Sequence, residues 1–126
     1  MTPFGARMRA LRRSRGITLK DMAGALGVSS AYLSALEHGR RGRPTWYLIQ
    51  QIIVYFNVIW DEAEEITRLA DLSHPRVVID TAGLDPRATE VANLLAERVG
   101  HISGAELDAL AAILRGSPAG KPVEKL

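Results

Sequence analysis

The chain has 126 residues, enough for one modest hydrophobic core or for one small domain with an appended segment. It contains no cysteine, which excludes disulfides and thiolate metal sites and agrees with a cytoplasmic location. The net charge of +2 is unevenly distributed, because residues 1–43 carry nine Lys or Arg and two acidic residues, whereas residues 44–126 carry seven and twelve. A basic segment of this kind is typical of a protein that binds a polyanion, although many exposed helices carry a solvated basic face.

The N-terminal segment predicts a helix over residues 2–15. Thr2 is a suitable N-cap, Pro3 suits the first helical position, and Gly16 ends the helix. Apolar residues recur at helical spacing, namely Phe4, Met8 and Leu11. We therefore expect the arginines at positions 7, 9, 12, 13 and 15 on the other faces.

Residues 18–39 predict two short helices joined by a tight turn. Thr18 can cap the first helix, and Asp21 completes a capping box with it. Gly27 follows where the end of a helix needs a left-handed residue, and Ser29 can cap the second helix. Leu33 and Leu36 give that second helix a buried side before it ends at Gly39.

This stretch resembles the lambda-repressor-like helix-turn-helix family, of the Cro and Xre type. The matching residues lie in register, and they are Ala23, Gly27, Val28, Ser29, Leu33, Ser34 and the closing Glu37-His38-Gly39. The resemblance implies a five-helix DNA-binding domain, and with the helices expected after it the whole chain should have an all-α fold. An ordinary helical hairpin could use the same caps and glycines, but the basic charge over the motif favours binding to DNA.

The resemblance also implies which residues face DNA. Those expected at base edges are Ser30, Ala31, Ser34 and Ala35. Those expected near phosphates are Lys20, Ser29, Tyr32, His38, Arg40, Arg41 and Arg43. The family often has a glutamine just after the cap of the first motif helix, where this chain has Leu19, so the usual glutamine bridge is in doubt. Because the side chains of the reading face are small, we expect limited direct readout and more specificity from DNA shape and the arginines.

The arginines at 40, 41 and 43 lie in a segment that cannot be the interior of a helix, because it also contains Gly42 and Pro44. This loop could follow the DNA backbone, place a guanidinium in the minor groove, or serve only as a soluble connection. His38 could equally stay at the end of its own helix.

Two more helices complete the expected domain over residues 1–70. Thr45 can cap a helix that runs to about Phe56. Residues 52–56 favour a strand by propensity, but a single strand would have no partner and the resemblance requires a helix. The last helix is expected from about Asp61 to Ala70, with acidic residues in its first turn.

Residues 71–84 are interpreted as a linker, or as a short strand over 76–80 that pairs with its copy in a dimer. Residues 85–116 predict a C-terminal helical hairpin, in which Asp85-Pro86 starts one helix and Ser103 with Glu106 forms a capping box for the next. The hairpin cannot bury both of its apolar stripes alone, so it must pack either on the first domain or on another subunit. Of these two, we expect packing on another subunit, which would make residues 85–116 a dimerisation region. Residues 117–126 are expected to be a flexible tail.

No motif in the sequence points to an enzyme, because we find no phosphate loop, metal-ligand spacing or nucleophile motif, and we expect no cofactor. Neither a signal peptide nor a membrane-spanning segment is recognised. We therefore expect a sequence-specific transcriptional regulator that binds double-stranded DNA as a homodimer on a palindromic operator. One alternative is an antitoxin-type DNA-binding protein that neutralises a protein partner through its C-terminal helices. The other is a coactivator-like module whose helix-turn-helix binds protein.

Overall fold

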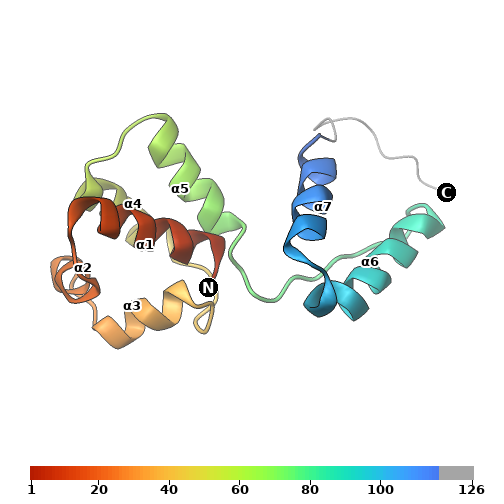
Figure 1. The fold of residues 1–126 in the computed structure, drawn as a ribbon, viewed down its shortest axis with the longest axis horizontal. Coiled ribbons are helices and arrows are strands. Elements are labelled where there is room, and N and C mark those ends of the chain that lie inside the picture. The colour runs from red at the N-terminus through yellow and green to blue at the C-terminus, as the bar shows by residue number, and fades with distance from the viewer. Residues whose placement is uncertain (117–126) are drawn as a thin grey trace. The chain divides into compact units, whose positions relative to one another are not determined.

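The computed structural model describes residues 1–116 and divides the chain into two compact units, Met1–Val77 and Val78–Leu126 (Figure 1). The expected flexible tail, residues 117–126, lies outside the described residues. Every regular element from residue 1 to 116 is a helix, which confirms the all-α prediction. In chain order these elements are α1 (Pro3–Arg15), α2 (Leu19–Leu26), α3 (Ser30–Glu37), α4 (Trp46–Phe56), α5 (Asp61–Asp71), α6 (Pro86–Arg98), the short 3₁₀ helix η1 (Val99–His101) and α7 (Gly104–Gly116).

Capping residues set the helix ends in the first unit. A side-chain oxygen accepts a hydrogen bond from a first-turn N–H at each of Thr2, Thr18, Ser29 and Thr45. The predicted capping box is confirmed, because Thr18 and Asp21 each accept a hydrogen bond from the other's backbone N–H. Gly27 ends α2 with φ 72° and ψ 28°, the left-handed conformation that glycine adopts without strain.

Residues 52–56 belong to α4 rather than to a strand. The buried residues of α4 recur at helical spacing, and they are Leu48, Ile49, Ile52 and Phe56. Since a helix places them all on the core side, packing outweighs the strand propensity of this run.

The core of the first unit lies between its five helices. Helix α1 packs on α3 and α5, α2 packs on α3 and α4, and α4 packs on α5. The largest fully buried apolar side chains are Phe4, Met8, Met22, Leu33, Leu36, Ile49, Ile52, Phe56 and Ile66. This packing leaves α3 along one edge of the unit, at the bottom in Figure 1.

An ion pair is buried beside this core. Arg12 of α1 and Glu37 of α3 are 7% and 2% exposed, and the two guanidinium nitrogens of Arg12 donate to the two carboxylate oxygens of Glu37. The prediction that Arg12 lies on an outer face with the other α1 arginines is therefore wrong. Arg12 is four residues after Met8, so the helix turns it toward the core.

The residues that follow α5 complete the first unit. The Ser73 side chain is buried, accepts a hydrogen bond from the Phe4 N–H at 2.9 Å and donates one to the carbonyl of Leu69. It thereby satisfies an N–H group that the start of α1 leaves free. This hydroxyl adds a hydrogen-bonded link between the end of α5 and the start of α1.

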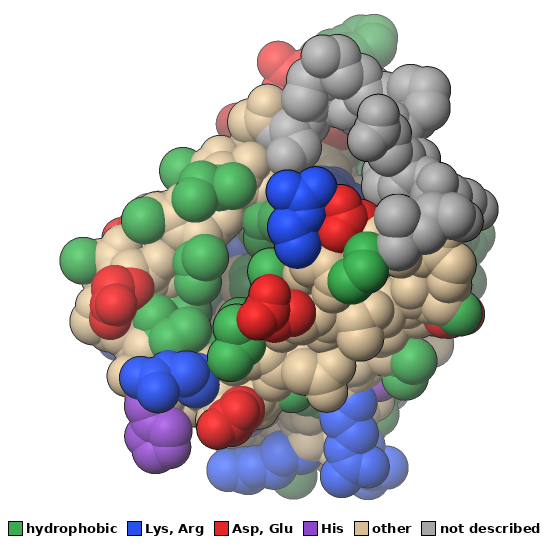
Figure 2. Space-filling model, turned by 90° about the vertical axis from the view of Figure 1, so that its right-hand side faces the viewer, with side chains coloured by type: hydrophobic (Ala, Val, Ile, Leu, Met, Phe, Trp, Pro, Cys, Tyr) green, Lys and Arg blue, Asp and Glu red, His purple; other side chains and the backbone are tan. Residues whose placement is uncertain are grey.

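The second unit contains helices, and its described residues, 78–116, form no buried core. Asp85 caps α6, and the predicted capping box of Ser103 and Glu106 at α7 is confirmed. Residues 76–80 form no strand in the single chain, and none of residues 78–116 is buried. Hydrophobic side chains lie on the surface drawn in Figure 2. The exposed large ones on α6, η1 and α7 include Val91, Leu94, Val99, Leu107, Leu110 and Leu114.

Between residues 1 and 116 there is no helix that combines the length and the apolar character needed to cross a membrane.

Candidate nucleic-acid interface

Helix α3 is held by one side and leaves the other side accessible. Leu33, Leu36 and Glu37 are its buried residues. The four residues expected at base edges lie away from that side, with Ala31 exposed and the other three half-buried, namely Ser30, Ser34 and Ala35. The accessible side of α3 is therefore short, small in volume and without charge.

The polar groups at the two ends of α3 are engaged with its own backbone. The Ser29 hydroxyl oxygen accepts a hydrogen bond from the Tyr32 N–H at 3.0 Å, as an N-cap does. At the other end, Nδ1 of His38 lies 2.8 Å from the carbonyl oxygen of Ser34. Both residues remain exposed. The structure thus places Ser29 and His38 at opposite ends of the helix, each in a capping role.

The three loop arginines have three different surroundings, although all of them are exposed. The Arg41 guanidinium carbon lies 5.7 Å from the centre of the Tyr32 ring. Arg43 forms an ion pair with Asp71 at the end of α5, with 2.5 Å between Nη2 and Oδ1. Arg40 has no ion-pair partner within the described residues. Arg43 is thus directed toward α5, while Arg41 is directed toward α3.

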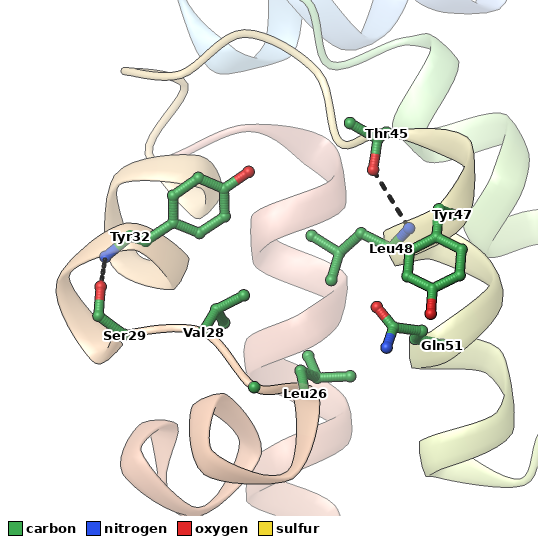
Figure 3. Close-up of a pocket in the computed structure, with 9 residues that line it drawn as sticks. Leu26, Val28, Ser29, Tyr32, Thr45, Tyr47, Leu48 and Gln51 are labelled. Atoms are coloured by element: carbon green, nitrogen blue, oxygen red, sulfur yellow. Dashed lines mark hydrogen bonds between the residues drawn. The ribbon is translucent and has the colours of Figure 1, made fainter.

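An open pocket separates the turn before α3 from the start of α4 (Figure 3). Ser29 and Tyr32 line it on one side, and Thr45 and Leu48 line it on the other. Tyr47 and Gln51 of α4 also line it, and sequence reasoning did not single them out. An available signal was the pair of aromatic residues directly after the Thr45 cap, which no core position of α4 requires.

Some basic residues of the first unit are paired with acidic residues, and others are not. Arg12 is buried against Glu37, and Nε of Arg7 lies 3.7 Å from Glu65. Lys20, in the first turn of α2, is exposed and has no ion-pair partner in the described part of the chain. The ion pairs thus leave Lys20, Arg40 and Arg41, which lie in or directly after the α2–α3 motif, without an acidic partner among the described residues. Within residues 1–116, no group of three or more His, Asp or Glu is arranged to hold a metal ion.

Comparison with known proteins finds a matching domain family and several similar proteins. The helix-turn-helix domain family matches residues 3–74, which cover all five helices of the first unit. An uncharacterised HTH-type transcriptional regulator of Bacillus subtilis, RghRB, is 38% identical over 61 residues, which are 48% of this chain and 44% of that protein.

Two further relatives match shorter stretches. The HTH-type transcriptional repressor RghR of Bacillus subtilis is 46% identical over 44 residues, 35% of this chain and 33% of its own length. The HTH-type transcriptional regulator DdrOP3 of Deinococcus deserti is 59% identical over 34 residues, 27% of this chain and 26% of its own length. This chain therefore spans less than half the length of each of the three relatives that it matches.

Proposed function

This chain belongs to the helix-turn-helix domain family, and we propose that it is a sequence-specific transcriptional regulator that binds double-stranded DNA through α3. The observation that carries the proposal is the accessible side of α3 together with Arg40 and Arg41 of the following loop, which form no ion pair within residues 1–116. An α-helix fits the major groove, and small side chains allow a close approach to the base edges. Arg40, Arg41 and Lys20 supply the charge that binding to phosphates needs.

A salt titration tests the binding to DNA. We expect the affinity of the full chain for a labelled duplex of random sequence to fall steeply with salt, with a log–log slope of about −0.9 for each phosphate contact. An affinity independent of salt would contradict the proposal and would favour the coactivator-like alternative, in which the motif binds protein.

Sequence specificity is tested by footprinting. We expect the full chain to protect a two-fold related site in the DNA upstream of its own gene, at protein concentrations that leave flanking DNA unprotected. Uniform protection along the fragment would indicate a DNA-binding protein without an operator. The proposal also places the protein in the compartment that holds the DNA, as the expected cytoplasmic location does.

We further propose that two copies of the chain bind together, through the C-terminal region that contains α6 and α7. The support is that no residue between 78 and 116 is buried, although these helices carry large apolar side chains. Apolar surface of this extent is unusual in a soluble monomer and marks an interaction site. A homodimer would pair two α3 helices with the two halves of a palindromic operator.

The same apolar surface favours one alternative, in which α6 and α7 bind and neutralise a different protein, as in an antitoxin. The homodimer and the antitoxin-type alternative can be distinguished by mass. The purified chain is mixed with the product of the neighbouring gene, and the mass of the resulting complex is measured. A stable mixed complex in place of the homodimer would favour the antitoxin-type function.

A further inference from the structure

The ring of Tyr32 is in contact with a loop that comes after α3 in the chain. Tyr32 belongs to the first turn of α3, whereas Arg41 follows the last residue of α3 by four positions. The guanidinium carbon of Arg41 nevertheless lies 5.7 Å from the centre of the Tyr32 ring. The Arg41 side chain must therefore run back along α3 toward its N-terminal half.

The loop is held on both sides of Arg41. Before it, the Arg40 N–H donates to the carbonyl of Ala35 at 2.9 Å, and Gly39 has a φ of 78° that reverses the chain. After it, the side chain of Arg43 pairs with Asp71. These contacts fix the ends of the loop, and the Tyr32 ring is the contact that directs the Arg41 side chain.

A cation–π contact with an aromatic ring leaves the positive charge of an arginine uncancelled. The ring has no formal charge, so the guanidinium keeps its full charge and its planar set of five N–H donors. A carboxylate partner, by contrast, occupies those donors and cancels the charge. Arg43 has such a partner in Asp71, and no ion pair within residues 1–116 involves Arg41.

We propose that Tyr32 is a positioning residue that holds the Arg41 guanidinium beside the N-terminal half of α3, and that Arg41 is the member of this pair that binds a DNA phosphate. This inference rests on the proposed function, because it assumes that α3 meets DNA. Arg43, which the sequence grouped with Arg41, then supports the loop from α5 and makes little contribution to the binding of phosphate.

Variants of the full chain test this assignment on a labelled duplex of random sequence between about 50 and 200 mM salt. Arg41→Ala is expected to reduce the salt slope by about one, the loss of one phosphate contact. Tyr32→Leu is expected to weaken binding about two- to fivefold, the usual contribution of an exposed cation–π contact. Tyr32→Phe keeps the ring and removes the hydroxyl, so it should bind like the unmodified chain.

The double variant and one control complete the experiment. If the ring acts through Arg41, then Tyr32→Leu has no further effect once Arg41→Ala is present. The matched control is Arg43→Ala, which should leave the salt slope within half a unit of the unmodified chain, because Asp71 already neutralises this arginine. The melting temperature of each variant is measured as well, and unchanged values exclude a loss of fold.

The possible failures are distinguishable. If the unmodified chain binds DNA with no dependence on salt, the proposed function fails and this inference fails with it. If it binds with a steep slope but the effects of Tyr32→Leu and Arg41→Ala are additive, only the inference fails. A loss of binding in Tyr32→Phe equal to that in Tyr32→Leu would likewise overturn it, since the hydroxyl and not the ring would then carry the effect. So would an effect of Arg43→Ala equal to that of Arg41→Ala.

Discussion

Gly5 occupies the place where α1 comes closest to the end of α3. A Cβ atom at this position would lie 2.1 Å from the carbonyl oxygen of Glu37. That oxygen cannot easily move away, because it also accepts a hydrogen bond from the Thr2 N–H at 2.9 Å, and the Glu37 side chain is paired with Arg12. The contact between α1 and the helix proposed to read DNA thus requires a residue with no side chain.

We expect Gly5→Ala to lower the free energy of unfolding by more than about 2 kcal/mol, since it forces the two backbones apart. The matched control is Gly24→Ala, because Gly24 is also helical but a Cβ atom added there would meet no neighbouring group within 4 Å. That substitution should raise the free energy of unfolding by about 0.5–1 kcal/mol. Denaturant unfolding measures both, and equal effects of the two substitutions would contradict the close approach of α1 to α3.

Trp60 has a backbone conformation that side chains disfavour. Its φ is 52° and its ψ is −123°, values close to the first central position of a type II′ turn, where glycine is preferred. The side chain is 80% exposed and makes no capping hydrogen bond to α5. Nothing in the first unit offsets the resulting strain through burial of the indole.

Trp60→Gly should therefore raise the melting temperature, because relief of a strain of about 1–3 kcal/mol exceeds the entropic cost of a new glycine. The control is the neighbouring exposed residue Ile59, whose φ is not positive. Ile59→Gly gains no such relief and should lower the melting temperature. A decrease for both substitutions would show that Trp60 is not strained.

Caps and glycines made most of the helices predictable, since these signals are local. The starts of α1, α2, α3, α4 and α6 follow from Thr2, Thr18, Ser29, Thr45 and Asp85. The contacts that join one helix to another could not be read in this way. Arg12 with Glu37, and Ser73 with Phe4, are separated by many residues in the chain, and only the packed fold shows that each pair meets.

In the candidate site, too, the local features could be predicted from the sequence, whereas the contacts between elements could not. The residues of α3 follow from the spacing of its buried leucines, but the different surroundings of Arg41 and Arg43 depend on Tyr32 and on α5. One missed signal was present in the sequence. Glu37 follows Leu33 by four positions, so it shares the buried side of α3, and a buried carboxylate calls for a basic partner.

We expect the stability of the first turn of α6 to depend on pH. Hydrogen bonds from the Arg87 side chain and backbone N–H lower the pKa of Asp85 from 3.8 to about 2. Because the pKa is depressed in the folded helix, the ionised cap stabilises α6 fully above pH 3.8, and this stabilisation is lost as the pH falls through about 2.

We expect the backbone amide resonances of Arg87 and Ala88 to titrate with a midpoint near this lowered pKa of about 2, as the first turn of α6 frays. Asp85→Asn is the control, since asparagine is also a good N-cap but has no charge to lose over this range. A midpoint near 3.8 in the unmodified chain would mean that Arg87 does not stabilise the carboxylate.

The two units of the molecule differ in how they bury apolar surface. Met1–Val77 contains every buried residue among those described, whereas none of residues 78–116 is buried. A set of helices without a core does not normally remain folded alone in water. The proposed pairing with a second copy of the chain would give the helices of the second unit such a surface, with the same apolar stripes.

We expect the full chain to sediment as a dimer and a fragment of residues 1–77 to sediment as a folded monomer that binds a half-site weakly. The fragment ends after Ser73, because removal of that residue would leave the Phe4 N–H at the start of α1 without its partner.

Leu107→Ser with Leu110→Ser in the full chain should also give a monomer, because the substitutions remove two apolar contacts from α7. As a control, Val54→Ser alters an exposed apolar residue of the first unit and should leave the dimer intact. Sedimentation equilibrium over a range of protein concentrations measures all four, and a dimeric fragment or a monomeric full chain would each contradict dimerisation through α6 and α7.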